Sequence, residues 1–223
     1  MLNLAFVVIL SYLVGSIPTS IIVSKLVRGI DIREHGSGNA GGSNVFRVLG
    51  WKFGILVILL DALKGALAVI VVARFYLDSF PFKNITPFDD FTLVQIICGV
   101  TAVIGHIWTV FAGFHGGKGI ATGLGVLIML VTIDMALALG VFFIVVAVFR
   151  YISLGSLAAA VSVPLILLIR ENLFGVDIQG YHTVLPFCII LALLVIYTHR
   201  KNIDRILKGS ESKISFLKKN TVK

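Results

Sequence analysis

A glycine-rich polar segment between two apolar stretches is the first part of the sequence suited to chemistry. Residues 36–44 hold four glycines, two serines and two asparagines, and Arg47 follows three residues later. Glycines let backbone amides converge on an anion, and a guanidinium grips phosphate through paired hydrogen bonds. Four side chains can add donors: Ser37, Asn39, Ser43 and Asn44. We expect a phosphate-binding segment, with a flexible linker between two helices as the alternative.

A second segment, 105–122, contains the run Gly-Gly-Lys-Gly at 116–119, directly before a predicted helix. Unpaired amides and the helix dipole at a helix N-terminus favour an anion. The spacing GxxxxGK[ST] is absent, so nucleotide hydrolysis is not supported. The rival explanation is that Gly119 and Gly123, four residues apart, allow close helix packing. Packing alone does not explain Lys118.

A third segment, 199–211, follows the last apolar block. Three apolar residues share one face of a short helix at the membrane interface: Ile203, Ile206 and Leu207. Attraction to anionic lipid explains much of its basic charge. It does not explain His199 and Asn202 on adjacent turns at the membrane edge.

Long apolar blocks must position these segments. Of 223 residues, 58% are hydrophobic and 13% are charged, about half the charged fraction of a soluble domain. The composition predicts an all-α, polytopic membrane helix bundle. The clear blocks cover roughly 2–24, 53–73, 91–111, 152–169 and 184–197. The first block lacks a basic start, so we interpret it as a retained span and not a cleaved leader.

The ambiguous block 120–149 decides the topology. It is interrupted only by Asp134 and forms one long helix or two short ones. Basic loops stay cytoplasmic, and the net charge of +8 gathers in the loop 25–52 and the tail 200–223. Both lie inside only if the block forms two helices with a turn near Asp134. We therefore predict about seven transmembrane helices, an outside N-terminus and a cytoplasmic C-terminal tail, in a single domain over 1–223.

Two smaller features belong to the spans. Asp61 and Lys64 lie three residues apart within an apolar block, where they can pair on one helix face. We interpret them as a structural or substrate-lining pair. Cys98 and Cys188 have no partner motif or metal spacing, and we expect both to be core residues.

The three segments together resemble the bacterial acyl-phosphate:glycerol-3-phosphate acyltransferase family. The matching patterns are GSGNxGxxN…R in 36–47, GHxxxxFxxFxGGKGxAT in 105–122 and HRxNIxRxxxGxE in 199–211, in the family's order. Three residues depart from the family's usual choices: Ser43 for threonine, Thr109 for proline and His115 for lysine. The last removes one fixed positive charge.

The resemblance implies an enzyme of the bacterial inner membrane with its active site at the cytoplasmic face. It would move a fatty acyl group from acyl phosphate to the 1-hydroxyl of glycerol 3-phosphate, giving lysophosphatidic acid for phospholipid synthesis. The implied partners are glycerol 3-phosphate, fatty acyl phosphate and membrane lipid, without a cofactor or metal. Nucleic acid is not expected, because the basic charge follows the membrane boundary. The oligomeric state is open, and a monomer is compatible with the sequence.

Site roles follow from the matched positions. The catalytic candidates are Ser37, Arg47, Lys118, His199 and Asn202. The substrate-binding candidates are Asn39, Ser43, Asn44, Gly116, Gly117, Gly119 and Thr122. Glu211 is expected to be structural.

The expected mechanism is direct attack of the glycerol hydroxyl on the acyl carbonyl, without metal or covalent intermediate. Phosphate is a good leaving group, and neither a GxSxG elbow nor an HxxxxD pair is present. Positioning and charge stabilisation would supply most of the rate. Two alternatives are an organic-anion transporter and a non-enzymatic lipid-binding or scaffolding protein.

Overall fold

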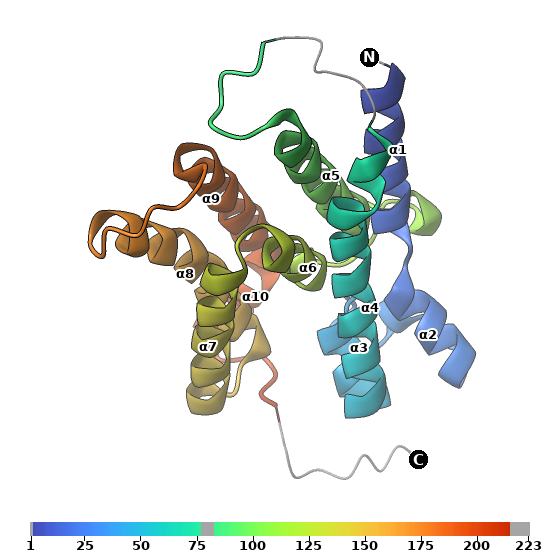
Figure 1. Ribbon diagram of the computed structural model, residues 1–223. Helices are drawn as coiled ribbons and strands as arrows, with labels where there is room; N and C mark the ends of the chain where they lie inside the picture. The colour runs from blue at the N-terminus through green and yellow to red at the C-terminus, as the bar shows by residue number, and fades with distance from the viewer. Residues whose placement is uncertain (1, 77–82, 215–223) are drawn as a thin grey trace. The chain divides into compact units, whose positions relative to one another are not determined.

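The computed structural model describes residues 2–76 and 83–214, and every regular element in them is helical (Figure 1). The α-helices are α1 Leu2–Ser16, α2 Thr19–Arg28, α3 Gly42–Leu49, α4 Trp51–Ile70, α5 Asp90–Ile107, α6 Ile120–Leu130, α7 Thr132–Phe149, α8 Ile152–Asn172, α9 Tyr181–Thr198 and α10 Arg200–Leu207. Short 3-10 turns cover Ile32–Glu34, Val72–Phe75 and Val110–Ala112. The predicted all-α class is confirmed, and the part of the basic tail at 215–223 lies outside the described residues.

The chain forms two compact units. The first comprises Met1–Ile133 and Asp177–Val184, and the second comprises Asp134–Val176 and Leu185–Lys223. The first and second polar segments belong to the first unit, and the third belongs to the second unit. The prediction of a single domain stays a prediction.

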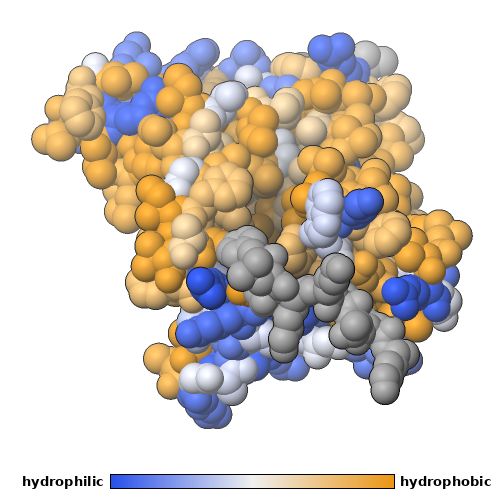
Figure 2. All heavy atoms as spheres, turned by 90° about the horizontal axis from the view of Figure 1, so that it is seen from below, coloured by the Kyte–Doolittle hydropathy of each residue, from blue (hydrophilic) through white to orange (hydrophobic). Residues whose placement is uncertain are grey.

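Six helices of the described chain have the length and composition to cross a membrane. They cover Asn3–Arg28, Trp51–Phe75, Asp90–Ala112, Thr132–Phe149, Ile152–Asn172 and Tyr181–Thr198. They expose many large apolar side chains, as lipid-facing helices do, and Figure 2 shows such side chains over much of the face in view. The sequence predicts about seven.

The difference lies in the block 120–149. The structure divides it at Val131 into α6 and α7, so the prediction of two helices is confirmed. However, α6 has only 11 residues, or about 16 Å at the α-helical rise. That is roughly half of the hydrocarbon thickness. It therefore counts as a short apolar helix and not as a seventh full-length span.

The first apolar block is also interrupted. α1 ends at Ser16 and α2 begins at Thr19, because Pro18 lacks an amide N–H and disfavours helical geometry at Ile17. The break exposes the Ile17 carbonyl, which accepts a hydrogen bond from Lys64 Nζ at 2.9 Å. A proline break thus creates a polar contact inside the first unit.

Within the first unit, α4 packs against α3, α5 and α6, while α1 packs against α5 (Figure 1). Glycines allow the backbones to approach, as in other membrane helix pairs. A Cβ on Gly65 would overlap the Thr122 carbonyl, and one on Gly125 would overlap the Ala62 carbonyl. A Cβ on Gly123, in contrast, would have nothing within 4 Å of it. The alternative explanation, close packing at both Gly119 and Gly123, therefore fails at Gly123, and Gly125 is the glycine that lets α6 approach α4 closely.

Candidate functional site

The first polar segment is folded around the side chain of Asn44, in the first turn of α3. Its Oδ1 accepts a hydrogen bond from the Ser37 amide at 2.8 Å. Its Nδ2 lies at donor distance from three loop carbonyls: Ile32 at 3.0 Å, His35 at 2.9 Å and Asn39 at 3.1 Å. Asn44 is only 2% exposed, so its carboxamide holds the loop that carries Ser37.

Two glycines in this segment have backbone conformations that favour glycine, and the helix that follows carries the arginine. Gly36 and Gly38 adopt φ values of 61° and 72°, which side-chain-bearing residues rarely adopt. The segment leads into α3, which carries Ser43 in its first turn and Arg47 in its last. Ser37, Ser43 and Arg47 are all half-buried, as expected for side chains at the edge of a site.

The second polar segment folds back onto the C-terminal end of α5. Gly116 donates its amide to the Ile107 carbonyl at 3.0 Å, and Gly117 donates to the His106 carbonyl at 3.1 Å. Both amides therefore satisfy terminal carbonyls of α5. Gly119 then precedes α6 with φ of 83°, a left-handed geometry that explains the glycine. Lys118, half-buried, lies between Gly117 and Gly119 in this turn.

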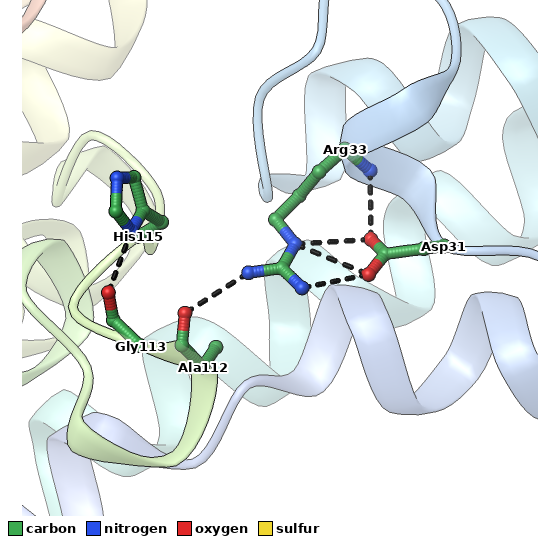
Figure 3. A network of polar contacts seen from close by, with 5 residues as sticks. All are labelled: Asp31, Arg33, Ala112, Gly113 and His115. Atoms are coloured by element: carbon green, nitrogen blue, oxygen red, sulfur yellow. Dashed lines mark hydrogen bonds and ion pairs between the residues drawn. The ribbon is translucent and has the colours of Figure 1, made fainter.

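The first unit brings these two segments into contact. Arg33 Nη1 donates to the Ala112 carbonyl at 2.9 Å, and the same guanidinium forms a two-pronged pair with Asp31, with Nη2 2.7 Å from Oδ2 (Figure 3). A Cβ on Gly117 would lie 2.8 Å from the Ala40 carbonyl, so the backbones also approach there. This contact could not be predicted from the sequence, because Arg33 and Ala112 are 79 positions apart and Arg33 is one of several basic residues in its loop.

The bridging arginine changes the acidity of its partner. The Arg33 side-chain hydrogen bonds lower the pKa of Asp31 to about 2, even though burial acts in the opposite direction. The pair is therefore ionised over all physiological pH values. In the same view His115, which replaces the family's usual lysine, places Nδ1 2.6 Å from the Gly113 carbonyl (Figure 3).

The third polar segment lies in the second unit and is organised by Glu211. Its Oε1 accepts hydrogen bonds from Asn202 Nδ2 and Ser153 Oγ, both at 2.7 Å, and its Oε2 lies 2.7 Å from Arg205 Nε. His199, 3% exposed, lies just before α10 with Nδ1 2.9 Å from the Val195 carbonyl. Sequence reasoning missed Ser153 and Arg205 as partners of the carboxylate.

The structure thus brings some of the predicted residues together. Ser37, Arg47 and Lys118 belong to two segments in contact within the first unit. His199 and Asn202 share the ordered end of the second unit, and their convergence with Lys118 stays a prediction. Thr122 is fully buried against α4, and its hydroxyl has no hydrogen-bond partner in the described residues.

Comparison with known proteins gives one consistent result. A family model described as glycerol-3-phosphate acyltransferase matches residues 5–209. A glycerol-3-phosphate acyltransferase of Chlorobaculum tepidum is 45% identical over 235 residues, covering 99% of this chain and 100% of that protein. One of Chlorobium chlorochromatii is 43% identical over 238 residues, covering 97% and 99%.

Solved structures agree with the sequence relatives. The chain is similar to crystal structures of PlsY (YgiH), an integral membrane glycerol 3-phosphate acyltransferase, in its glycerol 3-phosphate and lysophosphatidic acid forms. The TM-scores are 0.77 and 0.76, at 38% identity over 96% of each chain.

Proposed function

We propose, from the premise that the chain belongs to the glycerol-3-phosphate acyltransferase family, that its donor is a fatty acyl phosphate and its product is lysophosphatidic acid. The chain is an integral, multi-pass membrane enzyme of this family. PlsY has been solved in glycerol 3-phosphate and lysophosphatidic acid forms, which supports the same acceptor and product here. Family membership also sets aside the transporter and scaffold alternatives.

One observation carries the proposal: the two glycine-rich segments contact each other in the first unit. Gly117 of the second segment approaches the Ala40 carbonyl of the first, and Arg33, three residues before the first segment, donates to the Ala112 carbonyl of the second. An enzyme that joins an acyl phosphate to glycerol 3-phosphate must hold two phosphate groups close together. The two adjacent segments carry Arg47 and Lys118, which gives one cationic side chain for each phosphate group.

The side chains divide into two groups of roles. Lys118, with the N-terminal end of α6, would hold the phosphate of glycerol 3-phosphate. His199 and Asn202 of the second unit are proposed separately to contribute to activity. Arg47, Ser37 and Ser43 would hold the acyl-phosphate head and the developing oxyanion.

The attack itself needs no residue to form a bond to the acyl group. The glycerol 1-hydroxyl forms the new C–O bond to the carbonyl carbon, and the carbonyl–phosphate bond breaks. The hydroxyl proton leaves with the phosphate or passes to a neighbouring base. Holding both reactants in attack geometry supplies the main acceleration.

The sequence also predicts substrate contacts for Asn39, Asn44 and the amides at 116–117. Because the Asn44 carboxamide and the Gly116 and Gly117 amides make the protein contacts described above, we assign these three groups to shaping the site. Thr122, fully buried, is assigned to the seat of α6 on α4. Asn39 and Gly119 remain proposed substrate neighbours.

We further propose an outside N-terminus and a cytoplasmic active site in a bacterial inner membrane. The proposal rests on the basic loop between α2 and α4 and on the positive-inside rule. Cysteines placed singly at the half-buried Ser37 and Lys118, and at the exposed Arg200 next to the buried His199, should react with an impermeant thiol reagent from the cytoplasmic side only. The native Cys98 and Cys188 are buried and give little background. Labelling of the three sites from opposite sides would refute the arrangement.

The activity test uses purified protein with glycerol 3-phosphate and either acyl phosphate or acyl-CoA. Acyl transfer from acyl phosphate alone is expected, and equal transfer from acyl-CoA would refute the donor assignment. Lys118→Ala should chiefly raise KM for glycerol 3-phosphate, by at least about tenfold for a lost charged contact. Lys52→Ala, at the start of α4 beside the Trp51 ring, is the matched control and should keep the native KM.

A further inference from the structure

A buried cluster of three ionisable side chains packs against the turn 116–119 and has no part in the proposed chemistry. Lys64 Nζ is 2.9 Å from Asp61 Oδ1, and His106 Nδ1 is 3.5 Å from the same oxygen. Asp61, Lys64 and His106 are only 1%, 4% and 6% exposed. The sequence prediction of a pair between Asp61 and Lys64 is confirmed, and His106 is the member it missed.

The cluster ties three parts of the first unit together. Thr19 Oγ1, at the start of α2, donates to Asp61 Oδ1 at 2.6 Å. Lys64 Nζ also donates to the carbonyl of Ile17 at the proline break. Asp61 and Lys64 come from α4 and His106 comes from α5. Buried ion pairs contribute little net stability on average, and charges within membrane spans are usually retained for function.

The imidazole of His106 lies between Asp61 and the glycine turn. Its Nδ1 faces Asp61, so Nε2, on the opposite edge of the ring, faces away from the carboxylate. A Cβ added to Gly117 would overlap His106 Nε2 and lie 2.8 Å from its Cε1. The ring therefore forms the wall against which Gly117 packs, while the His106 carbonyl accepts the Gly117 amide.

The same stretch of α4 supports the other side of the turn. Two residues next to the charged pair lie in close backbone contact with α6. Ala62 packs against Gly125, and Gly65 packs against Thr122. Residues 61–65 thus fix both the wall before Lys118 and the helix that begins after it.

We propose that the Lys64–Asp61–His106 cluster is a positioning device for the turn 116–119, with His106 as the positioning residue that sets where Lys118 is presented. The cluster acts through the turn and does not touch substrate. This inference rests on the proposed role of Lys118 in binding glycerol 3-phosphate. In this proposal the buried ion pair fixes the positions of α2, α4, α5 and the turn relative to one another.

A pair of substitutions separates the two edges of the imidazole. In His106→Asn the amide nitrogen occupies the place of Nδ1, so the contact to Asp61 is kept and the wall against Gly117 is lost. In His106→Gln the amide nitrogen reaches the place of Nε2 and keeps the wall. We expect His106→Asn to raise KM for glycerol 3-phosphate about tenfold or more, because small misplacements of binding groups have large kinetic effects. We expect His106→Gln, which keeps the wall but loses the contact to Asp61, to raise the same KM about threefold, which is less than in His106→Asn.

The controls distinguish this inference from the proposed function. An unchanged KM in Lys118→Ala would defeat the proposed role of Lys118 itself. A raised KM in Lys118→Ala together with native KM in both His106 variants would overturn the positioning role alone. Equal loss of kcat in both variants with native KM would also overturn it, since that is the result of a merely structural histidine.

A second pair of substitutions, in the turn and in α6, tests the contact between Gly117 and the His106 ring. Gly117→Ala should raise KM, whereas Gly123→Ala, with open space around its added Cβ, should not. If His106→Asn fails to fold in detergent, this pair decides, and a native KM in Gly117→Ala overturns the proposal.

Discussion

Replacing Asn44 with alanine removes the centre of the first polar segment. The substitution leaves the Ser37 amide and the carbonyls of Ile32, His35 and Asn39 without their carboxamide partner. Two N–H groups and one oxygen make about three full hydrogen bonds, each worth about 0.5–1.5 kcal/mol net. We expect a loss of about 2–4 kcal/mol in the ordering of the loop. Because Ser37 lies on that loop, the loss should appear in catalysis.

The assay compares kcat/KM and the thermal unfolding midpoint of the detergent-solubilised protein. A disordered loop should lower kcat/KM by about tenfold to a thousandfold, since each 1.4 kcal/mol corresponds to a factor of about ten. Asn44→Asp should be no better, because a carboxylate keeps the acceptor for Ser37 but faces three carbonyl oxygens. Asn172→Ala, which loses an exposed bond to the Leu168 carbonyl at 3.0 Å, is the matched control. Native kcat/KM in Asn44→Ala would refute the reasoning.

Three further outcomes follow from packing, charge geometry and linkage. Gly125→Ala should lower the thermal midpoint because its Cβ would overlap the Ala62 carbonyl, whereas Gly123→Ala should be near neutral; equal midpoints would contradict the assignment. Arg33→Lys loses the guanidinium fork that joins Asp31 to the Ala112 carbonyl of the second segment and should raise KM for glycerol 3-phosphate without unfolding the protein. Burial acts to raise the pKa of Glu211, but hydrogen bonds from Arg205, Ser153 and Asn202 together hold this pKa below its ordinary value. The stabilisation by the carboxylate is therefore complete above the unfolded pKa and is lost as the pH falls through the lower folded pKa. The midpoint difference between wild type and Glu211→Gln should therefore be largest near neutral pH and shrink as the pH falls through the lowered folded pKa of Glu211; a difference independent of pH would contradict this account.

The sequence predicted those features that depend on local pattern. Apolar block lengths predicted the helices, and the interruption near Asp134 predicted the division of 120–149. The spacing of Asp61 and Lys64 predicted their pair. The block 2–24 was predicted as one continuous span, whereas Pro18 divides it into α1 and α2.

Contacts between distant segments left no such pattern. The Arg33 contact with Ala112 spans 79 positions, and the Ser153 contact with Glu211 spans 58. Each depends on how helices pack, which composition does not encode position by position. The glycine pattern at 116–119 likewise predicted where the turn lies but not the acceptors of its amides.

Those acceptors change how a glycine-rich segment should be interpreted in this enzyme. Glycine at 117 is required because the His106 ring and the Ala40 carbonyl occupy the space of a side chain. Its amide and that of Gly116 are committed to α5, and the amide of Ser37 is committed to Asn44. In both segments the backbone is therefore fixed by the protein before substrate arrives. We therefore propose that recognition of phosphate depends mainly on charged and hydroxyl side chains on these turns, with the N-terminal end of α6, and that specificity depends on how accurately buried residues such as Asn44 and His106 hold the turns.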